Sequence, residues 1–103
     1  MRRSFSQTTL SRLREMPSEA ALARLAIFLK TDQTYQPAKD ATSRRWQVRT
    51  TIGEFEILTT GVKWYDVRAK KGGGGSIDLA MHVLHVPFVR AVQHLIADRP
   101  ADG

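Results

Sequence analysis

The sequence predicts a single α+β domain: an N-terminal helix, a three-stranded antiparallel sheet, and two short C-terminal helices packed on that sheet. Apolar residues recur at helical spacing over 19–30 and 77–96, residues 45–67 alternate between apolar and polar, and glycines at 53, 61 and 72–75 separate segments. A chain of 103 residues, 42% of them hydrophobic, has room for one core. We assign residues 1–17 to a basic flexible arm with a short helix, 18–98 to the domain and 99–103 to a tail.

Residues 1–14 contain no acidic residue and are rich in Arg, Ser and Thr. This composition fits either an organellar transit peptide or a basic arm that leads into a helix, and we favour the arm. Leu10, Leu13 and Met16 predict a helical turn or two before Pro17. The chain has no cysteine, no signal-like apolar segment and no apolar run long enough for a membrane span, so we expect a cytoplasmic protein without a membrane partner.

The first long helix is predicted over 19–30, where EAALARLAIFLK consists of strong helix formers. Ser18 is its predicted N-cap. The helix has few charged residues, so we expect it to lie in the core. Its apolar stripe comprises Leu22, Leu25, Ala26 and Leu29.

Three strands are predicted over 45–51, 54–60 and 62–67, with turns at 52–53 and 61. In the first strand, Trp46 and Val48 alternate with Arg45, Gln47 and Arg49. The glycines at 72–75 are predicted to end the sheet. A sheet of three strands with one apolar face requires a cover, which the helix over 19–30 can supply.

Two helices are predicted after the glycines. Ser76 is the expected N-cap of the first, and Asp78 places a favourable charge in its first turn. Pro87 occupies a first-turn position of the second. The second helix carries the clearest apolar stripe, formed by Phe88, Ala91, Val92, Leu95 and Ile96.

The formal net charge of +6 and a pI near 10.3 favour a polyanionic partner, although a positive excess also serves solubility. The main candidate site is a basic, glycine-rich loop, because glycine lets backbone approach a phosphate and free N–H groups at a helix start attract anions. The lysines precede the glycines, so the loop is not a P-loop. The alternative is a flexible reversal with solvated lysines. The loop comprises Lys63, Arg68, Lys70, Lys71, Gly72, Gly73, Gly74, Gly75 and Ser76.

The polar face of the predicted sheet is the second candidate, because arginines beside an aromatic ring can hold phosphates while the ring stacks on a base. Arg45, Arg49 and Tyr65 are the residues concerned. Alternatively, Glu54 and Glu56 pair with Arg49 across the hairpin. Trp46 and Trp64 are predicted to belong to the core.

Asp78, His82 and His85 share one side of a predicted helix at i, i+4 and i+7, a spacing that can hold a metal. Met81 and Leu84 intervene, and we assign neither a metal nor any other cofactor. No serine or threonine has an evident base and no pair of carboxylates is matched, so no catalytic residue is assigned.

Over 64–96 the sequence resembles the zinc-ribbon-like N-terminal domain of bacterial DnaG-type DNA primases. It resembles still more the zinc-free relatives of that domain in primase-like and mobilisation proteins of plasmids and integrated elements. The resemblance rests on Trp64-Tyr65, the run from Lys71 to Gly75, Ile77-Asp78-Leu79 with Met81, and an F-x-x-A-V-x-x-L ending at Phe88, Ala91, Val92 and Leu95.

The zinc form of that family uses three cysteines and a histidine, whereas residues 65–70 here read YDVRAK and the chain has no thiol. Zinc therefore does not carry over, and neither does polymerase activity, because a Toprim-sized region does not fit in 103 residues. The resemblance implies a module that binds single-stranded DNA template, with a Toprim-type primase or a mobilisation protein as a partner. The alternative is a protein-interaction or dimerisation module that uses the helix over 19–30 and the arm before it.

Overall fold

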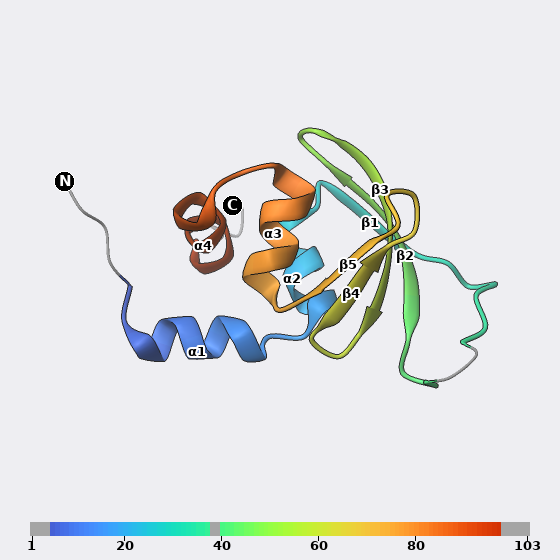
Figure 1. Cartoon of the computed structure of the whole chain (residues 1–103). Helices are drawn as coiled ribbons and strands as arrows, with labels where there is room; N and C mark the ends of the chain where they lie inside the picture. Colours follow the sequence, from blue (N-terminus) through green and yellow to red (C-terminus); the bar gives the residue numbers. More distant parts are fainter. Residues whose placement is uncertain (1–4, 38–39, 98–103) are drawn as a thin grey trace.

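The computed structural model describes residues 5–37 and 40–97. It confirms the α+β class, but the prediction of three strands was wrong: the sheet has five antiparallel strands, and the described residues form four helices. The strands lie side by side in chain order (Figure 1). The elements are α1 (Gln7–Glu15), α2 (Ser18–Leu25), β1 (Phe28–Thr31), β2 (Arg44–Thr50), β3 (Gly53–Thr60), β4 (Lys63–Asp66), β5 (Lys71–Gly74), α3 (Ser76–Leu84) and α4 (Phe88–Ile96).

The first additional strand, β1, comes from the second half of the predicted long helix. The helix ends at Leu25, and the N–H of Ile27 donates to Arg49 O at 2.7 Å. Phe28 then pairs with Arg49 and Leu29 with Val48 in an antiparallel register. Branched and aromatic side chains suit a strand, and the exposed edge of β2 supplies the backbone partners that a helix would otherwise provide.

The second additional strand, β5, is built from Lys71 and the glycines that were expected to end the sheet. Gly73 pairs with Trp64 and Gly72 with Tyr65 across the β4–β5 hairpin. The turn between the strands places Lys70 in the left-handed region at φ 57°. Glycine has a low strand propensity, so we attribute the pairing of β5 with β4 to the residues that pack against β5.

Both predicted serine caps were wrong for one physical reason. Ser18 and Ser76 are fully buried, and each hydroxyl donates to a carbonyl of a distant element instead of capping its own helix. Ser18 Oγ donates to Lys63 O at 3.1 Å, and Ser76 Oγ donates to Leu13 O at 2.6 Å. The second bond ties α1 to the start of α3, so the segment before Pro17 is a docked helix rather than a turn or two.

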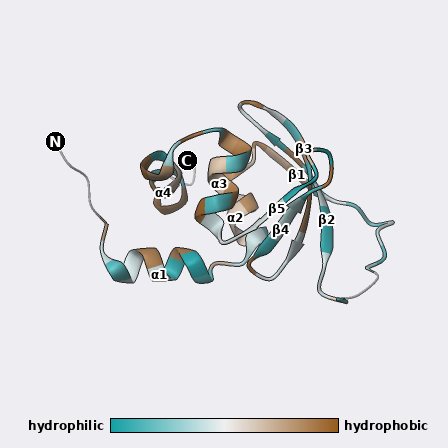
Figure 2. Ribbon diagram, viewed as in Figure 1, coloured by the Kyte–Doolittle hydropathy of each residue, from teal (hydrophilic) through white to brown (hydrophobic). Residues whose placement is uncertain are grey.

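All four helices lie on one side of the sheet (Figure 1). The core lies between the inner sheet face and the helices and continues between α3, α2 and α4; Figure 2 shows hydrophobic residues on these three helices. Val48, Ile57 and Trp64 contribute from the strands, which confirms the predicted core position of Trp64, while Trp46 is half-buried. The hairpin turn between β2 and β3 falls on residues 51–52, one residue earlier than predicted.

Residues 1–4 of the assigned arm, residue 98 of the assigned domain and the whole assigned tail, 99–103, lie outside the described residues. Within the described ranges, no single helix is long and apolar enough to span a membrane; α3 and α4 reach that length and hydropathy only as a pair, with a bend of 107° between them.

Candidate nucleic-acid interface

The outer face of the sheet, turned away from the helices, gathers most of the basic residues that the sequence singled out. On β2 the inward residues are Val48 and Thr50, so the alternation directs Arg45 and Arg49 outward. Lys63 and Tyr65 alternate with buried Trp64 and Asp66 on β4 and therefore also face outward. The acids beside these cations are Glu54 and Glu56 of β3 and, in the loop between β1 and β2, Asp32 and Asp40. We call this surface the outer face; its cations are Lys30, Arg45, Arg49, Lys63 and Arg68.

Glu56 holds two of these guanidinium groups in fixed positions. Arg45 donates from Nε and Nη2 to Glu56 Oε2, and Arg68 donates from Nε to Oε1 at 3.2 Å. The hydrogen bonds from Arg45 and then Arg68 lower the pKa of Glu56, and the same contact raises the pKa of Arg45. Asp32 Oδ2 also lies 3.9 Å from Arg45 Nε, so two carboxylates face the two guanidinium groups, and each arginine keeps N–H donors for a further acceptor.

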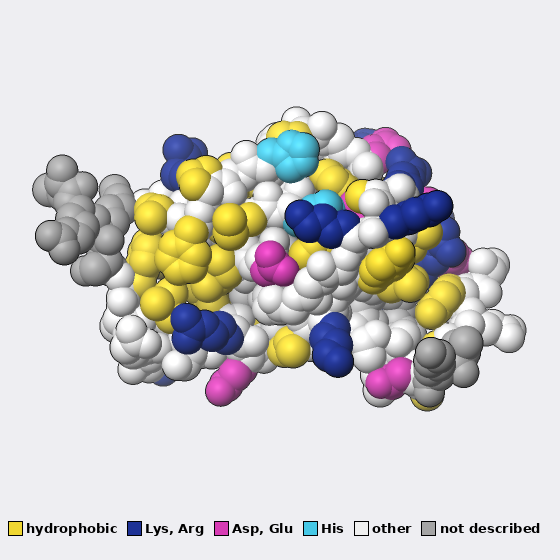
Figure 3. Space-filling model, viewed as in Figure 1, with side chains coloured by type: hydrophobic (Ala, Val, Ile, Leu, Met, Phe, Trp, Pro, Cys, Tyr) yellow, Lys and Arg dark blue, Asp and Glu magenta, His cyan; other side chains and the backbone are white. Residues whose placement is uncertain are grey.

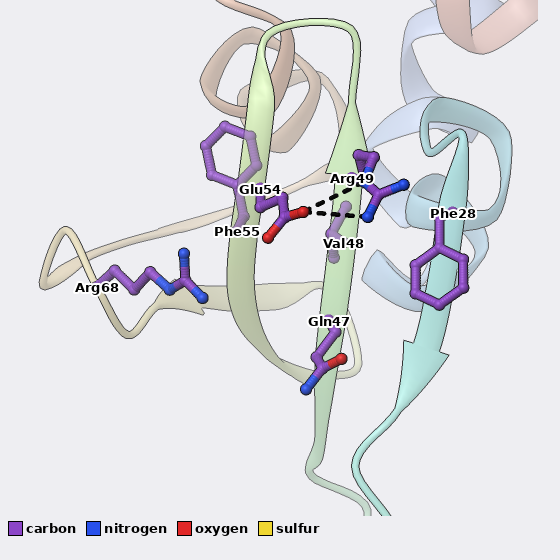
Figure 4. Close-up of a pocket in the computed structure, with 7 residues that line it drawn as sticks. All are labelled: Phe28, Gln47, Val48, Arg49, Glu54, Phe55 and Arg68. Carbon is purple, nitrogen blue, oxygen red and sulfur yellow. Dashed lines mark hydrogen bonds and ion pairs between the residues drawn. The ribbon is translucent and has the colours of Figure 1, made fainter.

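A second cluster lies at the other end of β2 (Figure 4). Arg49 donates to Glu54 Oε2 at 3.1 Å, which confirms a cross-strand pair between these residues, and its guanidinium carbon lies 5.6 Å from the centre of the Phe28 ring. A cavity of about 170 Å³ opens here, lined also by Gln47 and Arg68. Phe28 is 45% exposed, so its ring offers an aromatic surface beside the guanidinium group of Arg49.

Tyr65 and Lys63 stand next to positions without side chains. Their partners on β5 are Gly72 and Gly74, and a Cβ at Gly72 would lie 3.1 Å from the Tyr65 ring. Tyr65 is 41% exposed. Among the described residues, Lys63 has no ion-pair partner. An exposed ring and an unpaired cation thus lie on one strand, with only backbone beside them.

Lys70 and Lys71 occupy the end of the β4–β5 hairpin, where Figure 3 shows basic side chains near the exposed end of the sheet. The alternation of β5 places Lys71 on the side of α3, and it lines a cavity there together with Asp78 and His85. The structure therefore groups Arg45, Arg49, Arg68 and Lys63 on one face, with Lys70 at its edge and Lys71 on the far side of that edge.

Two of the predicted phosphate-binding amides, those of Gly74 and Gly75, have partners within the chain. Gly74 N donates to Asp78 Oδ2 at 3.3 Å and Gly75 N to Val62 O at 2.7 Å. Ser76 is buried and bonded to Leu13. A Cβ at Gly73 would overlap Asp78 Oδ2 and lie 2.7 Å from Trp64 Cζ2. Close packing therefore explains why position 73 is a glycine.

Asp66 and His82 form a buried pair at the base of the same hairpin. Burial acts to raise the pKa of Asp66, but the hydrogen bonds from Ala69 N–H, His82 and Arg68 N–H together lower it. Asp66 Oδ1 accepts the two backbone bonds at 2.9 Å. In the described part of the chain, no group of three or more acidic, histidine or cysteine side chains is placed to hold a metal ion.

Sequence reasoning missed Phe28 and Lys30, because both fell inside the predicted helix. The alternation of Phe28 and Lys30 with Leu29 and Thr31 was the sequence signal that could have indicated a strand here. It also missed Glu56 as the residue that positions Arg45 and Arg68, since the pairing depends on the registers of β2, β3 and the following turn.

Comparison of the chain with protein-family models, with curated proteins and with solved structures finds no match.

Proposed function

We propose that this chain binds single-stranded nucleic acid, preferably DNA, across the outer face of its sheet. The observation that carries the proposal is the uncovered face itself, where, among the described residues, five basic residues lie beside four carboxylates and two aromatic rings are exposed. The phosphate contacts are Lys30, Arg45, Arg49, Lys63 and Arg68, and Tyr65 stacks on a base. Lys70 and Lys71 extend the positive charge around the end of the hairpin.

Single strands fit this face better than a duplex. Phe28 and Tyr65 are exposed on a sheet surface, and rings of this kind stack on bases that are already unpaired. The structure has no free helix on this face to enter a major groove, since all four described helices lie on the opposite side (Figure 1).

The biological setting is part of the same proposal and rests on the resemblance to primase-type ribbon domains. In that setting the chain holds template for a primase-like replication or plasmid-mobilisation system in the cytoplasm, with a Toprim-type primase or a mobilisation protein as partner. The chain itself carries no proposed catalytic step.

Fluorescence anisotropy with labelled single-stranded and duplex DNA over a salt series tests the binding. About four phosphate contacts give a slope of roughly −3 in a plot of log affinity against log salt, at about 0.7 per contact on single strands. Tighter binding to duplex, or no binding at low salt, contradicts the proposal. RNA of the same sequence measures the preference for DNA.

A second candidate function is protein interaction, and one observation favours it. Figure 3 shows hydrophobic side chains gathered over α4 and next to α1, where Phe88 is 42% exposed and Phe5 and Leu10 are half-buried. The version based on the predicted long helix is not supported, because Ala21 and Leu22 of α2 are fully buried. An apolar interface keeps its affinity as salt rises, which separates the two functions.

A further inference from the structure

A groove on the outer face lies between the β1–β2 loop and the strands β3 and β4. Its volume is about 500 Å³, and it contains two tyrosines from distant parts of the chain. Tyr65 comes from β4 and Tyr35 from the loop that follows β1. Leu58 of β3, the cross-strand partner of Tyr65, also lines it.

The groove offers an aromatic surface that is open on one side. Tyr65 packs beside Gly72, whose missing side chain leaves nothing of β5 to cover the ring. Tyr35 is half-buried, and it also lines a neighbouring cavity together with Arg45. An unstacked base placed on Tyr65 would therefore meet a second ring in the same groove.

The polar groups of the groove differ in charge at its two sides. Lys63 supplies an ammonium group without an ion-pair partner in the described residues, and Asp40 supplies a carboxylate. Asp40 Oδ1 accepts both the N–H and the hydroxyl of Thr42, at 2.9 and 2.6 Å. These bonds lower the pKa of Asp40 and fix its orientation, and Oδ2 has no partner among the described residues.

Such a groove suits a ligand that has a phosphate, a flat ring and a hydrogen-bond donor. We propose that it holds one unpaired nucleobase, stacked on Tyr65 opposite Tyr35, and that Asp40 selects a base with an exocyclic amino group. Cytosine presents its N4 amino group to such a carboxylate, whereas thymine has a carbonyl at the same position. This inference rests on the proposed function and adds a base preference to it.

The test compares labelled dC12 with dT12, two pyrimidine oligonucleotides of equal length and charge. We expect the wild-type chain to bind dC12 about three- to tenfold more tightly. Asp40→Ala should bring this affinity ratio to about one, because the carboxylate that selects cytosine is gone. The lost charge can change the overall affinity, but it acts on both oligonucleotides alike and leaves the ratio unchanged. Tyr35→Leu should weaken binding of both by about fivefold or more, while Tyr35→Phe, which keeps the ring, should retain it.

The outcomes separate this inference from the proposed function. If the wild-type chain binds both oligonucleotides with the expected salt slope but shows equal affinity, or if the ratio survives Asp40→Ala, the base-selective groove is wrong and the outer-face function stands. Equal loss in Tyr35→Phe and Tyr35→Leu would also remove the stacking role. No binding of either oligonucleotide overturns both. Circular dichroism of each variant confirms that the fold is retained.

Discussion

His82 donates from Nε2 to Asp66 Oδ2 at 2.6 Å, and this bond joins α3 to the end of β4. Asp66 is 2% exposed, and its other oxygen accepts the N–H groups of Arg68 and Ala69. The His82 ring also packs against Trp64, with 4.8 Å between ring centres. A single carboxylate therefore fixes both the turn that carries Arg68 and the helix behind the hairpin.

Replacing Asp66 with asparagine should destabilise the fold. The amide keeps the shape but loses the charge. Its NH2 group either faces the N–H donors of Arg68 and Ala69 or forces His82 Nε2 to change from donor to acceptor, so we expect a loss of about 2–4 kcal/mol. Urea denaturation measures it. Asp78→Asn is the matched control, since Asp78 is exposed and accepts one bond of 3.3 Å; it should cost less than about 1 kcal/mol. Equal losses in the two variants would show that the Asp66–His82 pair contributes no more to stability than the exposed Asp78 does.

The same carboxylate predicts a pH dependence. The folded-state pKa of Asp66 is lowered below its ordinary 3.8, so the ionised form is favoured by folding. Its contribution is complete above that ordinary value and is lost as pH falls through the lower folded pKa. The free energy of unfolding of the wild-type chain should thus fall more steeply below pH 3.8 than that of Asp66→Asn. Parallel curves would contradict this, because Glu56 and the other carboxylates are common to both proteins.

Gly73 and Gly74 should respond differently to alanine. A Cβ at Gly73 would meet the Trp64 indole and the Asp78 carboxylate, whereas a Cβ at Gly74 meets nothing within 4 Å. We expect Gly73→Ala to cost about 1–3 kcal/mol and Gly74→Ala to lie within about 0.5 kcal/mol of wild type, by urea denaturation. If the two variants are equally stable and both lose DNA affinity, the glycines serve a ligand rather than packing.

Neutralising Lys30 and Lys63, the outer-face lysines without an ion-pair partner in the described part of the chain, should weaken DNA binding. Lys30→Gln with Lys63→Gln removes about two phosphate contacts, so the salt slope should become shallower by about 1.4. Anisotropy over a salt series measures this. The matched control is Arg12→Gln with Arg14→Gln, which removes the same charge from exposed positions of α1 on the other side of the sheet. An equal change of slope in both pairs would mean that net charge, and not the outer face, governs binding.

Local sequence patterns predicted the elements whose formation depends mainly on the residues within the element. The stripe from Phe88 to Ile96 forms α4, and the alternation from Arg45 to Thr60 forms β2 and β3 within a residue or two. These patterns also placed Arg45, Arg49, Lys63 and Tyr65 on the polar face. Each of these predictions depends only on which side of an element a residue occupies.

The two additional strands could not be predicted in this way. Residues 26–30 continue a strong helical sequence, yet Ile27 finds its hydrogen-bond partner in Arg49, more than twenty residues away. The glycines of β5 have low strand propensity, yet Gly73 lies where Trp64 and Asp78 leave no room for a side chain. Here tertiary contacts outweigh local preference.

The sequence by itself determined the class of the fold, the charge that suits a polyanion and the amphipathic faces, because composition and periodicity are local properties. Only the tertiary structure decided that Glu56 holds Arg45 and Arg68, that Asp66 holds the hairpin to His82, and that Tyr35 faces the same groove as Tyr65. Each of these contacts joins segments that are distant along the chain, and they meet only once the strands are in register and the loops and α3 are packed against the sheet.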